Sequence, residues 1–339
     1  MRILYGVQAT GNGHISRARA MEKHLSKAGV SVDFLFSGRP AEQFFDMQQF
    51  GQYQLRRGLT FVTAAGKVNY WQSVKQASLG ELWRDIQELD VSQYDLVLTD
   101  FEPITAWAAR RQHKTCVAIG HQYAFLHTIP MENANLLSQN IFRHFAPANY
   151  ALGLHWHHFN QPILPPIIDL PDIHVTTSAK QVLVYLPFED QLQVIRLLEP
   201  LTDFTFLVFG PGLTVGQLGH IQTQPPSLHA FKTALLQSEA VLSNEGFELI
   251  SEALQLKKHI LVKPLQGQME QQSNALALTQ LKLASRADKL SSKIIADWLY
   301  GAKTNNSIHY PNVAAAICDW LLQDTPDQTN RLVKALWDA

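Results

Sequence analysis

The stretch Gln161-Pro162-Ile163-Leu164-Pro165-Pro166 divides the sequence near its middle. Proline lacks a backbone N–H and fixes φ, so this stretch can be neither regular helix nor central strand. On both sides of it, short apolar runs alternate with segments of helical periodicity. The stretch is therefore predicted to link two α/β halves. The length of 339 residues agrees, because single cores stop growing at roughly 250 to 300 residues.

Before the linker, the apolar runs have the length and composition of buried strands. Fully apolar strands that alternate with helices are typical of a parallel sheet covered on both faces. Strands are expected at Ile3–Val7, Val32–Ser37, Leu59–Ala64, Asp95–Asp100 and Thr115–Gly120. Helices are expected at Ser16–Lys27, Trp71–Leu89 and Pro103–Gln112.

After the linker the alternation restarts. Strands are expected at Gln181–Pro187, Phe204–Phe209, Ala240–Asn244 and His259–Pro264. Helices are clearest at Gly246–Leu256 and Gln268–Leu281, and a helical tail begins at Asn312. The expected fold has two Rossmann-like domains facing a cleft, with the last helix packed back on the first domain. The predicted units are a first domain at 1–163, a linker at 164–178, a second domain at 179–311 and a tail at 312–339.

The first predicted strand ends in a turn with two glycines, Gly11-Asn12-Gly13-His14. Glycine lets the backbone turn sharply, and the free amides of a helix start favour an anion. A dinucleotide site is the rival interpretation. It is disfavoured because Ser16 replaces the third glycine of the fingerprint and Asp33 lies at the start of its strand. A tight βα turn with a solvated histidine remains the structural alternative.

A second strand end runs into a helix at Ser243-Asn244-Glu245-Gly246-Phe247-Glu248-Leu249-Ile250-Ser251-Glu252-Ala253. Gly246 would start the helix, where the macrodipole favours a pyrophosphate. Glu252 is placed to accept the hydroxyls of a ribose; the alternative is a solvated helix residue. Asn244 and Glu245 precede the turn, and Gly210 follows another predicted strand. All of these are candidate donor-binding residues.

A third segment of this kind, Pro264-Leu265-Gln266-Gly267-Gln268-Met269-Glu270-Gln271-Gln272-Ser273-Asn274-Ala275, joins the next strand to a helix. Its amide and acid side chains make directional hydrogen bonds that suit sugar hydroxyls. A polar capping segment is the alternative. Two such segments after consecutive strands would converge on one cleft.

The segment from Ser243 to Ala275 resembles the donor-binding region of GT-B glycosyltransferases that make the lipid-linked peptidoglycan precursor. The opening Tyr5–His14 and the segment Asp100-Phe101-Glu102-Pro103 also resemble a group of predicted bacterial and archaeal glycosyltransferases. The resemblance implies that a nucleotide diphosphate sugar, with uridine as the expected nucleotide, is a substrate, that no cofactor is needed, and that transfer inverts the anomeric centre. It implies that Gly246 and Phe247 contact the diphosphate, Glu252 the ribose, and Glu270 and Gln271 the donor sugar. It also implies that the loop with Gly11 and Gly13 faces the acceptor and the donor phosphates, and Asn274 belongs to the same donor segment.

The sequence also departs from the peptidoglycan enzymes. Asn12 separates the two N-terminal glycines, and Leu256-Lys257-Lys258 replaces a glycine turn. The acceptor-side loops do not match. The resemblance therefore implies the donor chemistry and leaves the acceptor unknown, with a lipid-linked acceptor as one option.

The expected reaction is attack of an acceptor hydroxyl on the anomeric carbon, with nucleotide diphosphate as the leaving group. His14 is the preferred candidate base, since imidazole ordinarily titrates near pH 6.5. Glu102 is the second candidate. Asp100 is expected either to orient His14 or to cap the following helix.

Composition excludes several classes of protein. The net charge of −1 and the apolar content of 46% describe a globular chain with no electrostatic basis for binding nucleic acid. The sequence has no Asp-x-Asp motif, and His155, His157 and His158 make only a weak metal signal, so no metal site is expected. Cys116 and Cys318 are expected to be buried thiols.

A cytoplasmic location is expected, because no apolar run reaches the roughly 20 residues of a membrane span and no signal peptide is evident. Peripheral membrane contact is left open by the stretch Asn140–Asn160, which mixes aromatic and basic residues. A core strand flanked by loops is the alternative for this stretch. A nucleotide-sugar 2-epimerase, a non-catalytic nucleotide-sugar-binding protein and an interaction protein are the alternatives for the whole chain.

Overall fold

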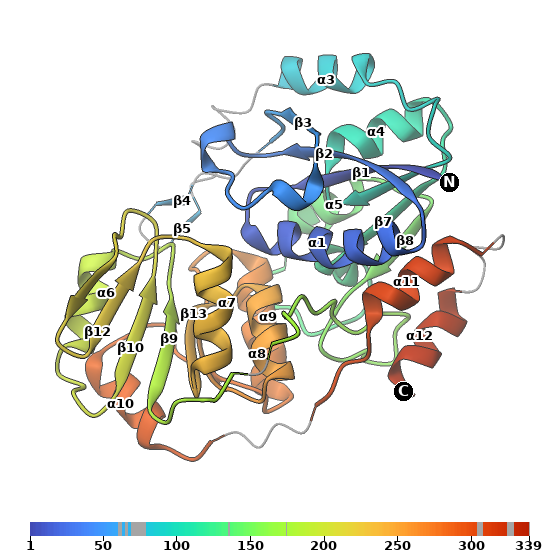
Figure 1. Ribbon diagram of the computed structural model, residues 1–339. Helices are drawn as coiled ribbons and strands as arrows, with labels where there is room; N and C mark the ends of the chain where they lie inside the picture. Colours follow the sequence, from blue (N-terminus) through green and yellow to red (C-terminus); the bar gives the residue numbers. More distant parts are fainter. Residues whose placement is uncertain are drawn as a thin grey trace.

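The computed structural model contains two large sheets in separate parts of the molecule, one formed before and one after the proline-rich stretch (Figure 1). The structure describes residues 1–59, 63–64, 67–68, 79–134, 136–173, 175–303, 308–323 and 329–338. We refer to the parts around the two sheets as the N-terminal and C-terminal lobes. The predicted architecture of two Rossmann-like units is confirmed.

The N-terminal sheet has six strands, all parallel. Their spatial order is β3 (Tyr53–Arg56), β2 (Ser31–Ser37), β1 (Arg2–Gln8), β6 (Leu96–Asp100), β7 (Cys116–Gly120) and β8 (Tyr150–Gly153). The central strands are apolar because helices cover both faces. One face packs on α1 (Asn12–Lys27), and the other on α3 (Leu79–Glu88) and α4 (Pro103–Arg111).

Shorter elements complete this lobe. They are the 3₁₀ turns η1 (Ala41–Gln43), η2 (Gln48–Phe50) and η3 (His121–Leu126), the helix α5 (Leu136–His144), and the antiparallel pair β4 (Thr63–Ala64) and β5 (Lys67–Val68).

The C-terminal sheet has seven strands and is parallel except at one edge, where β11 and β12 are antiparallel. The order is β11 (Gly216–Leu218), β12 (Ile221–Gln224), β10 (Thr205–Phe209), β9 (Gln181–Tyr185), β13 (Ala240–Asn244), β14 (His259–Lys263) and β15 (Ser285–Arg286). One face carries α7 (Leu228–Gln237), α8 (Phe247–Gln255) and α9 (Met269–Gln280). The other carries α6 (Gln191–Leu198) and α10 (Ser292–Tyr300).

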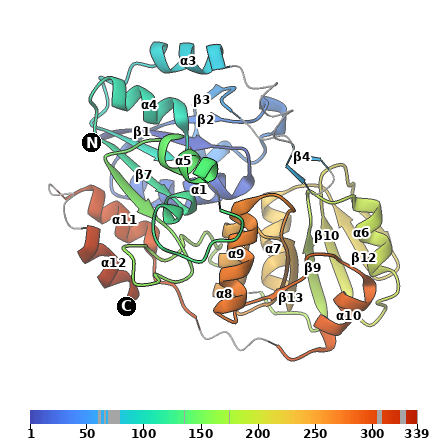
Figure 2. The same ribbon diagram turned by 180° about the vertical axis from the view of Figure 1, so that it is seen from behind.

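The chain returns to the N-terminal lobe at its end, as Figure 2 shows from behind. Helix α11 (Val313–Leu321) packs against α1, and α12 (Thr329–Trp337) packs against α11. Helix α1 also contacts α8 of the other lobe, so one apolar core runs through α8, α1 and α11. The predicted packing of the C-terminal helices on the N-terminal lobe is confirmed. The domain boundaries stay a prediction.

Some expected elements differ from the structure. The first helix begins at Asn12 and not at Ser16, because the glycine-containing turn itself forms the first helical turn. The strand expected at Leu59–Ala64 and the helix expected at Trp71–Leu89 fall partly outside the described residues; their described parts are β4 and α3. The strand that pairs with β2 is β3, at Tyr53–Arg56.

Candidate active site between the lobes

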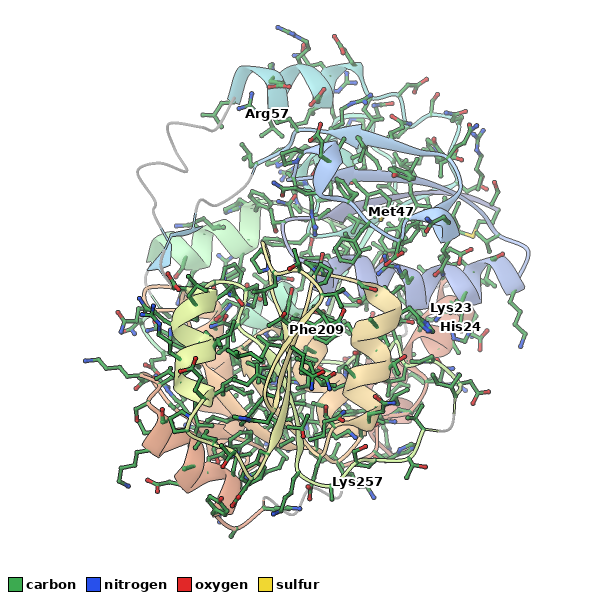
Figure 3. All side chains as sticks on the ribbon, turned by 60° about the vertical axis from the view of Figure 1, so that its left-hand side comes forward. Lys23, His24, Met47, Arg57, Phe209 and Lys257 are labelled. Carbon is green, nitrogen blue, oxygen red and sulfur yellow. The ribbon has the colours of Figure 1, made fainter. Side chains whose placement is uncertain are left out.

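A cavity of about 440 Å³ lies between the lobes, at the carboxyl ends of both sheets. Three helix starts line it together: Gly11–His14 before and within α1, Glu245–Glu248 at α8, and Gln268–Gln271 at α9. Figure 3 places Phe209, another lining residue, at the end of the C-terminal sheet nearest the other lobe. The three segments singled out in the sequence therefore meet at one site.

His14 lines this cavity, and a buried carboxylate orients its ring. Its Nδ1 lies 2.7 Å from Oδ1 of Asp100, the last residue of β6. Because Asp100 is a fully buried acceptor, Nδ1 carries the proton and donates it, which leaves Nε2 with a free lone pair. The side chain of His14 is 13% exposed, so the ring is accessible from the cavity.

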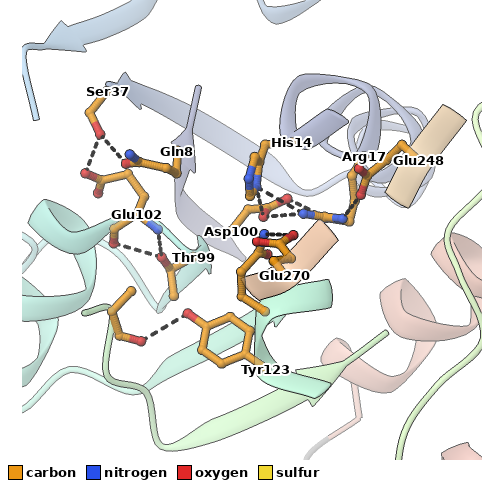
Figure 4. Close-up of polar contacts among 12 residues, drawn as sticks. Gln8, His14, Arg17, Ser37, Thr99, Asp100, Glu102, Tyr123, Glu248 and Glu270 are labelled. Carbon is orange, nitrogen blue, oxygen red and sulfur yellow. Dashed lines mark hydrogen bonds and ion pairs between the residues drawn. The ribbon is translucent and has the colours of Figure 1, made fainter. Parts of the chain in front are cut away.

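Arg17 fixes Asp100 in turn. Its Nε donates to Oδ2 at 2.6 Å and its Nη2 to Oδ1 at 2.7 Å, a bidentate pair in a buried setting (Figure 4). Burial alone would raise the pKa of Asp100, but the charges of Arg17 and His14 and their hydrogen bonds outweigh it and hold that pKa below its ordinary value. Asp100 is therefore a carboxylate that acts only as an acceptor.

Arg17 also reaches across the cleft to the other lobe. Its Nη1 forms an ion pair with Oε1 of Glu248, in the first turn of α8 (Figure 4). A Cβ built on Gly13 would lie 2.2 Å from Oε2 of the same carboxylate. Glycine is thus required at position 13 for the close approach of α1 to α8.

Glu102, the second candidate base, does not line the cavity. It is the N-cap of α4, and its carboxylate accepts from the backbone N–H groups of Ile104 and Thr105 and from the hydroxyls of Thr105 and Ser37. Burial raises the pKa of Glu102 even though these hydrogen bonds lower it. The alternative expectation that Asp100 caps this helix is wrong, because Glu102 fills that position.

On the donor side, Gly246 is the N-cap of α8 and has open space around it, since no atom lies within 4 Å of a Cβ built there. Phe247 is buried, and its ring stacks on His121 with centroids 4.0 Å apart. Backbone amides at this helix start are therefore accessible to a ligand, whereas the Phe247 ring joins the two lobes.

Glu252 lines the cavity and is only 3% exposed, so the alternative of a solvated helix residue is wrong, whereas the ribose contact stays a prediction. Its Oε1 accepts a hydrogen bond from Lys232 of α7. Burial raises the pKa of Glu252 to about 7, although Lys232 counteracts the shift. Lys232 contacts Oε1 alone, so the other carboxylate oxygen, Oε2, is not occupied by this lysine.

The candidates on α9 divide into two kinds. Glu270 lines the cavity and accepts from Nε2 of Gln122 at 3.0 Å. Gln271 also lines it, but its Oε1 accepts from the backbone N–H of Leu265 at 2.9 Å. Asn274 lies behind the cavity, where its Oδ1 is 2.7 Å from Nε2 of His121.

Two further candidates lie outside the cavity lining. Asn244 bridges neighbouring strand ends, donating to the carbonyl of Lys263 at 3.0 Å. A Cβ on Gly210 would meet the side chain of Gln191 at 2.2 Å, so this glycine serves close packing in the C-terminal lobe. Both residues shape the strand ends that border the site.

Several residues of the site gave no signal in the sequence. Gln122 and His121 lie in a 3₁₀ turn with no recognisable motif, and Arg17 and Lys232 lie within helices, where a basic residue is ordinarily solvated. Tertiary contacts identify them: Arg17 and Lys232 are buried beside acids, Gln122 donates to Glu270 and His121 contacts Asn274. An arginine three residues after His14, on the same helix face, is the one pattern that could have been noticed.

Aromatic side chains form the wall of the cavity in the N-terminal lobe, namely Phe45, Phe101, Phe142 and Phe145. Phe142 and Phe145 belong to the stretch Asn140–Asn160 that suggested membrane contact. Phe142 is 8% and Trp156 1% exposed, so these rings face inward and do not form a surface for a lipid bilayer.

The described residues also bear on metals, thiols and membranes. Within them, no three His, Cys, Asp or Glu side chains are grouped as a metal site would require. Cys116 and Cys318 are buried free thiols. No helix in the described part of the chain is long and apolar enough to cross a bilayer.

The family model described as glycosyl transferase family 1 matches residues 1–302. The chain belongs to glycosyl transferase family 1. It is therefore a glycosyltransferase with the GT-B fold, as the sequence predicts. No curated protein matches the chain.

Solved glycosyltransferases share this fold at low identity. SnogD from Streptomyces nogalater is 15% identical, with a TM-score of 0.57 over 99% of each chain. VinC, solved in complex with DTDP, is 13% identical, with a TM-score of 0.54 over 99% of this chain and 100% of that one. MurG from Acinetobacter baumannii is 14% identical, with a TM-score of 0.52 over 100% of this chain and 95% of that one.

Proposed function

We propose that this glycosyltransferase moves a sugar from a nucleotide diphosphate sugar, with uridine as the nucleotide, to a hydroxyl of its acceptor, and that His14 is the general base. The observation that carries the proposal is the contact of His14 Nδ1 with Asp100 at 2.7 Å, beside the cavity and across from the start of α8. This contact fixes the tautomer and aims Nε2 away from Asp100.

The start of α8 is the proposed site of the diphosphate. The first N–H groups of a helix have no acceptor within the helix, so the start of α8 after Gly246 and the positive end of its dipole favour an anion. Arg19 also lines the cavity, and its buried Nε has no partner among the described residues. Glu252 is the proposed ribose contact, through the carboxylate oxygen that Lys232 does not occupy.

In the proposed reaction, the acceptor hydroxyl gives its proton to Nε2 of His14 while its oxygen bonds to the anomeric carbon. The bond between that carbon and the phosphate oxygen breaks, and the electron pair leaves with the nucleotide diphosphate. The helix-start amides stabilise the charge that develops on the leaving group. Attack from the side opposite to the phosphate inverts the anomeric centre.

The aromatic wall supports an acceptor with an apolar body next to its reacting hydroxyl. Phe101, Phe142 and Phe145 line the cavity on the lobe that carries His14. Phe101 and Phe145 stack with centroids 4.9 Å apart. A lipid-linked acceptor and a free apolar alcohol both fit this description.

Two measurements test the proposal. Uridine diphosphate should raise the unfolding temperature more than NAD or ATP does, with about 2.7 kcal/mol gained at a hundredfold excess over the dissociation constant. Stronger stabilisation by NAD would contradict the donor assignment.

His14→Ala should lower the rate of transfer by about a hundred- to ten-thousandfold while nucleotide binding survives, because the proposed contacts at the start of α8 and at Glu252 lie on the other lobe. Glu102→Gln is the control, since Glu102 caps a helix outside the cavity and its loss should affect stability and not turnover. Full turnover in His14→Ala, or abolished turnover in a folded Glu102→Gln protein, would refute the assignment of the base.

A further inference from the structure

Glu245 is a buried carboxyl group that the protein itself leaves unsatisfied. It joins β13 to α8, lines the cavity and is 1% exposed, yet neither carboxyl oxygen has a hydrogen-bond partner among the described residues. Burying an unpaired polar group costs free energy, and such groups are rare in proteins. A ligand in the cavity would supply the missing partners.

A second unsatisfied acceptor belongs to the same part of the cavity. Gln122 also lines it, and its Oε1 is buried without a partner in the described chain. The Nε2 of Gln122 is already donated to Glu270, whose charge acts on Glu245. Among the described residues, three acceptor oxygens without partners therefore border this part of the cavity, two from Glu245 and one from Gln122.

Among the described residues, Arg286 is the cation whose charge lowers the pKa of Glu245, and its own donors are used elsewhere. Arg286 donates from Nη1 and Nη2 to Glu132, at 2.6 and 3.0 Å, and from Nε to Asp288 at 2.8 Å. Arg286 therefore acts on Glu245 only from a distance and occupies neither of its carboxyl oxygens. The group that completes this site has to bring O–H or N–H donors.

Position along the chain indicates what that group is. Glu245 immediately precedes Gly246, the N-cap of the helix whose amides form the proposed diphosphate site. In a nucleotide sugar, the pyranose is attached directly to the second phosphate. When the diphosphate is bound at the start of α8, the attached sugar ring is therefore expected beside Glu245.

We propose that Glu245 and Gln122 are further contacts of the donor sugar, beside the Glu270 that the family resemblance already implies, and that Glu245 selects a hexose whose free hydroxyls donate hydrogen bonds to it. The inference rests on the proposed function, because it assumes that a nucleotide sugar is the donor. A sugar that lacks the contacted hydroxyl leaves the buried acceptor unpaired. Sites built to bond a substrate hydroxyl discriminate strongly against analogues without it.

The test uses UDP-glucose and its four monodeoxy-fluoro analogues, at C2, C3, C4 and C6, in calorimetric titrations of the full chain. Fluorine has nearly the size of a hydroxyl but cannot donate a hydrogen bond. At least one analogue should bind about tenfold or more weakly than UDP-glucose. In Glu245→Met, which keeps the side-chain length and removes the acceptor, this penalty should disappear.

Glu199→Met is the matched control, since Glu199 is exposed at the end of α6 and should leave the penalty unchanged. If UDP and UDP-glucose bind but every analogue matches UDP-glucose, or if the penalty persists in Glu245→Met, the inference is overturned and the proposed function stands. If UDP itself does not bind, the proposed function fails. If Glu245→Met does not fold, Glu245→Gln replaces it and should reduce the penalty.

Discussion

At the scale of single residues, the carboxyl of Glu245 makes the stability of the empty protein depend on pH. Burial, and then the charge of Glu270, raise the pKa of Glu245 well above its ordinary 4.5. The folded chain therefore holds this proton more tightly than the unfolded chain does. The stability that results is complete below about pH 4.5 and is lost as pH rises through the pKa of the folded state.

Glu245→Gln should therefore remove part of this dependence. The substitution replaces the carboxyl with a neutral amide that does not titrate. Between pH 4.5 and the folded-state pKa, the free energy of unfolding of the variant should therefore rise relative to that of the native protein by up to about 1.4 kcal/mol for each pH unit. Unfolding temperatures of both proteins between pH 4.5 and 8 measure the difference. A difference that stays constant across this range would show that Glu245 does not titrate in the folded state.

Glu252 gives a second prediction at this scale. Glu252→Gln should weaken UDP binding by about tenfold or more, since hydrogen bonds to charged groups contribute about 1.5 to 3 kcal/mol. The amide keeps the shape beside Lys232, whereas alanine would leave that buried cation without its partner. Comparison of UDP with 2′-deoxy-UDP isolates the ribose contact. A native protein that binds both equally tightly would exclude a contact with the 2′-hydroxyl.

The sequence placed His14 and Asp100 correctly at strand and helix ends, because both follow apolar runs that end in polar residues. It could not distinguish Asp100 from Glu102 as the helix cap. Phe101, between them, has a positive φ of 54°, and this local twist turns Asp100 toward His14 and Glu102 into the cap. Such a twist has no signature in residue types, since phenylalanine rarely adopts it.

At the scale of elements, the approach of α1 to α8 depends on Gly13. Gly13→Ala places a methyl group against the carboxylate of Glu248 and should displace it from Arg17. Arg17 would keep Asp100, but because it is buried, loss of the Glu248 contact should lower the free energy of unfolding by about 1 to 3 kcal/mol and slow transfer. Unfolding temperature and turnover measure both effects.

Gly11→Ala is the control, since Gly11 has an ordinary φ of −124° and no atom within 4 Å of a built Cβ. Gly11→Ala should lower the free energy of unfolding by at most about 1 kcal/mol, because alanine is a poorer N-cap residue than glycine. If the two variants behave alike, the contact with Glu248 has no role.

Elements in the centre of each sheet could be predicted from sequence, and those at the edges could not. The strands β1, β6 and β13 are apolar because both of their faces are covered. The edge strands β3 and β11 are short and contain polar residues, so they lack a distinguishing pattern. The contact between the lobes was likewise hidden, since it brings together residues more than 200 positions apart, such as Arg17 and Glu248.

At the scale of the whole molecule, we propose that the tail at 312–339 stabilises the N-terminal lobe and not the C-terminal lobe. Ile317 of α11 and Ile295 of α10 are equally buried, but Ile317 lies in the core that includes α1 and Ile295 lies in the core beneath α6. Either isoleucine changed to alanine should cost about 2 to 5 kcal/mol.

The location of the damage should differ between these two variants. Ile317→Ala should increase hydrogen exchange in α1, whereas Ile295→Ala should increase it in α6 and leave α1 protected. Loss of protection in α1 from Ile295→Ala, or none from Ile317→Ala, would contradict the assignment of the tail.

The return of the chain to the first lobe means that the lobes are joined by two separate crossings. One crossing follows β8, and the other lies between α10 and α11, where Tyr310 hydrogen-bonds to the backbone of Trp156 on the first crossing. Two connections at separate points allow one body to rotate relative to the other about the line that joins them, and they restrict rotation about other axes. The lobes should accordingly open and close about one axis, so that Gly246 returns to the same place opposite His14 in every catalytic cycle.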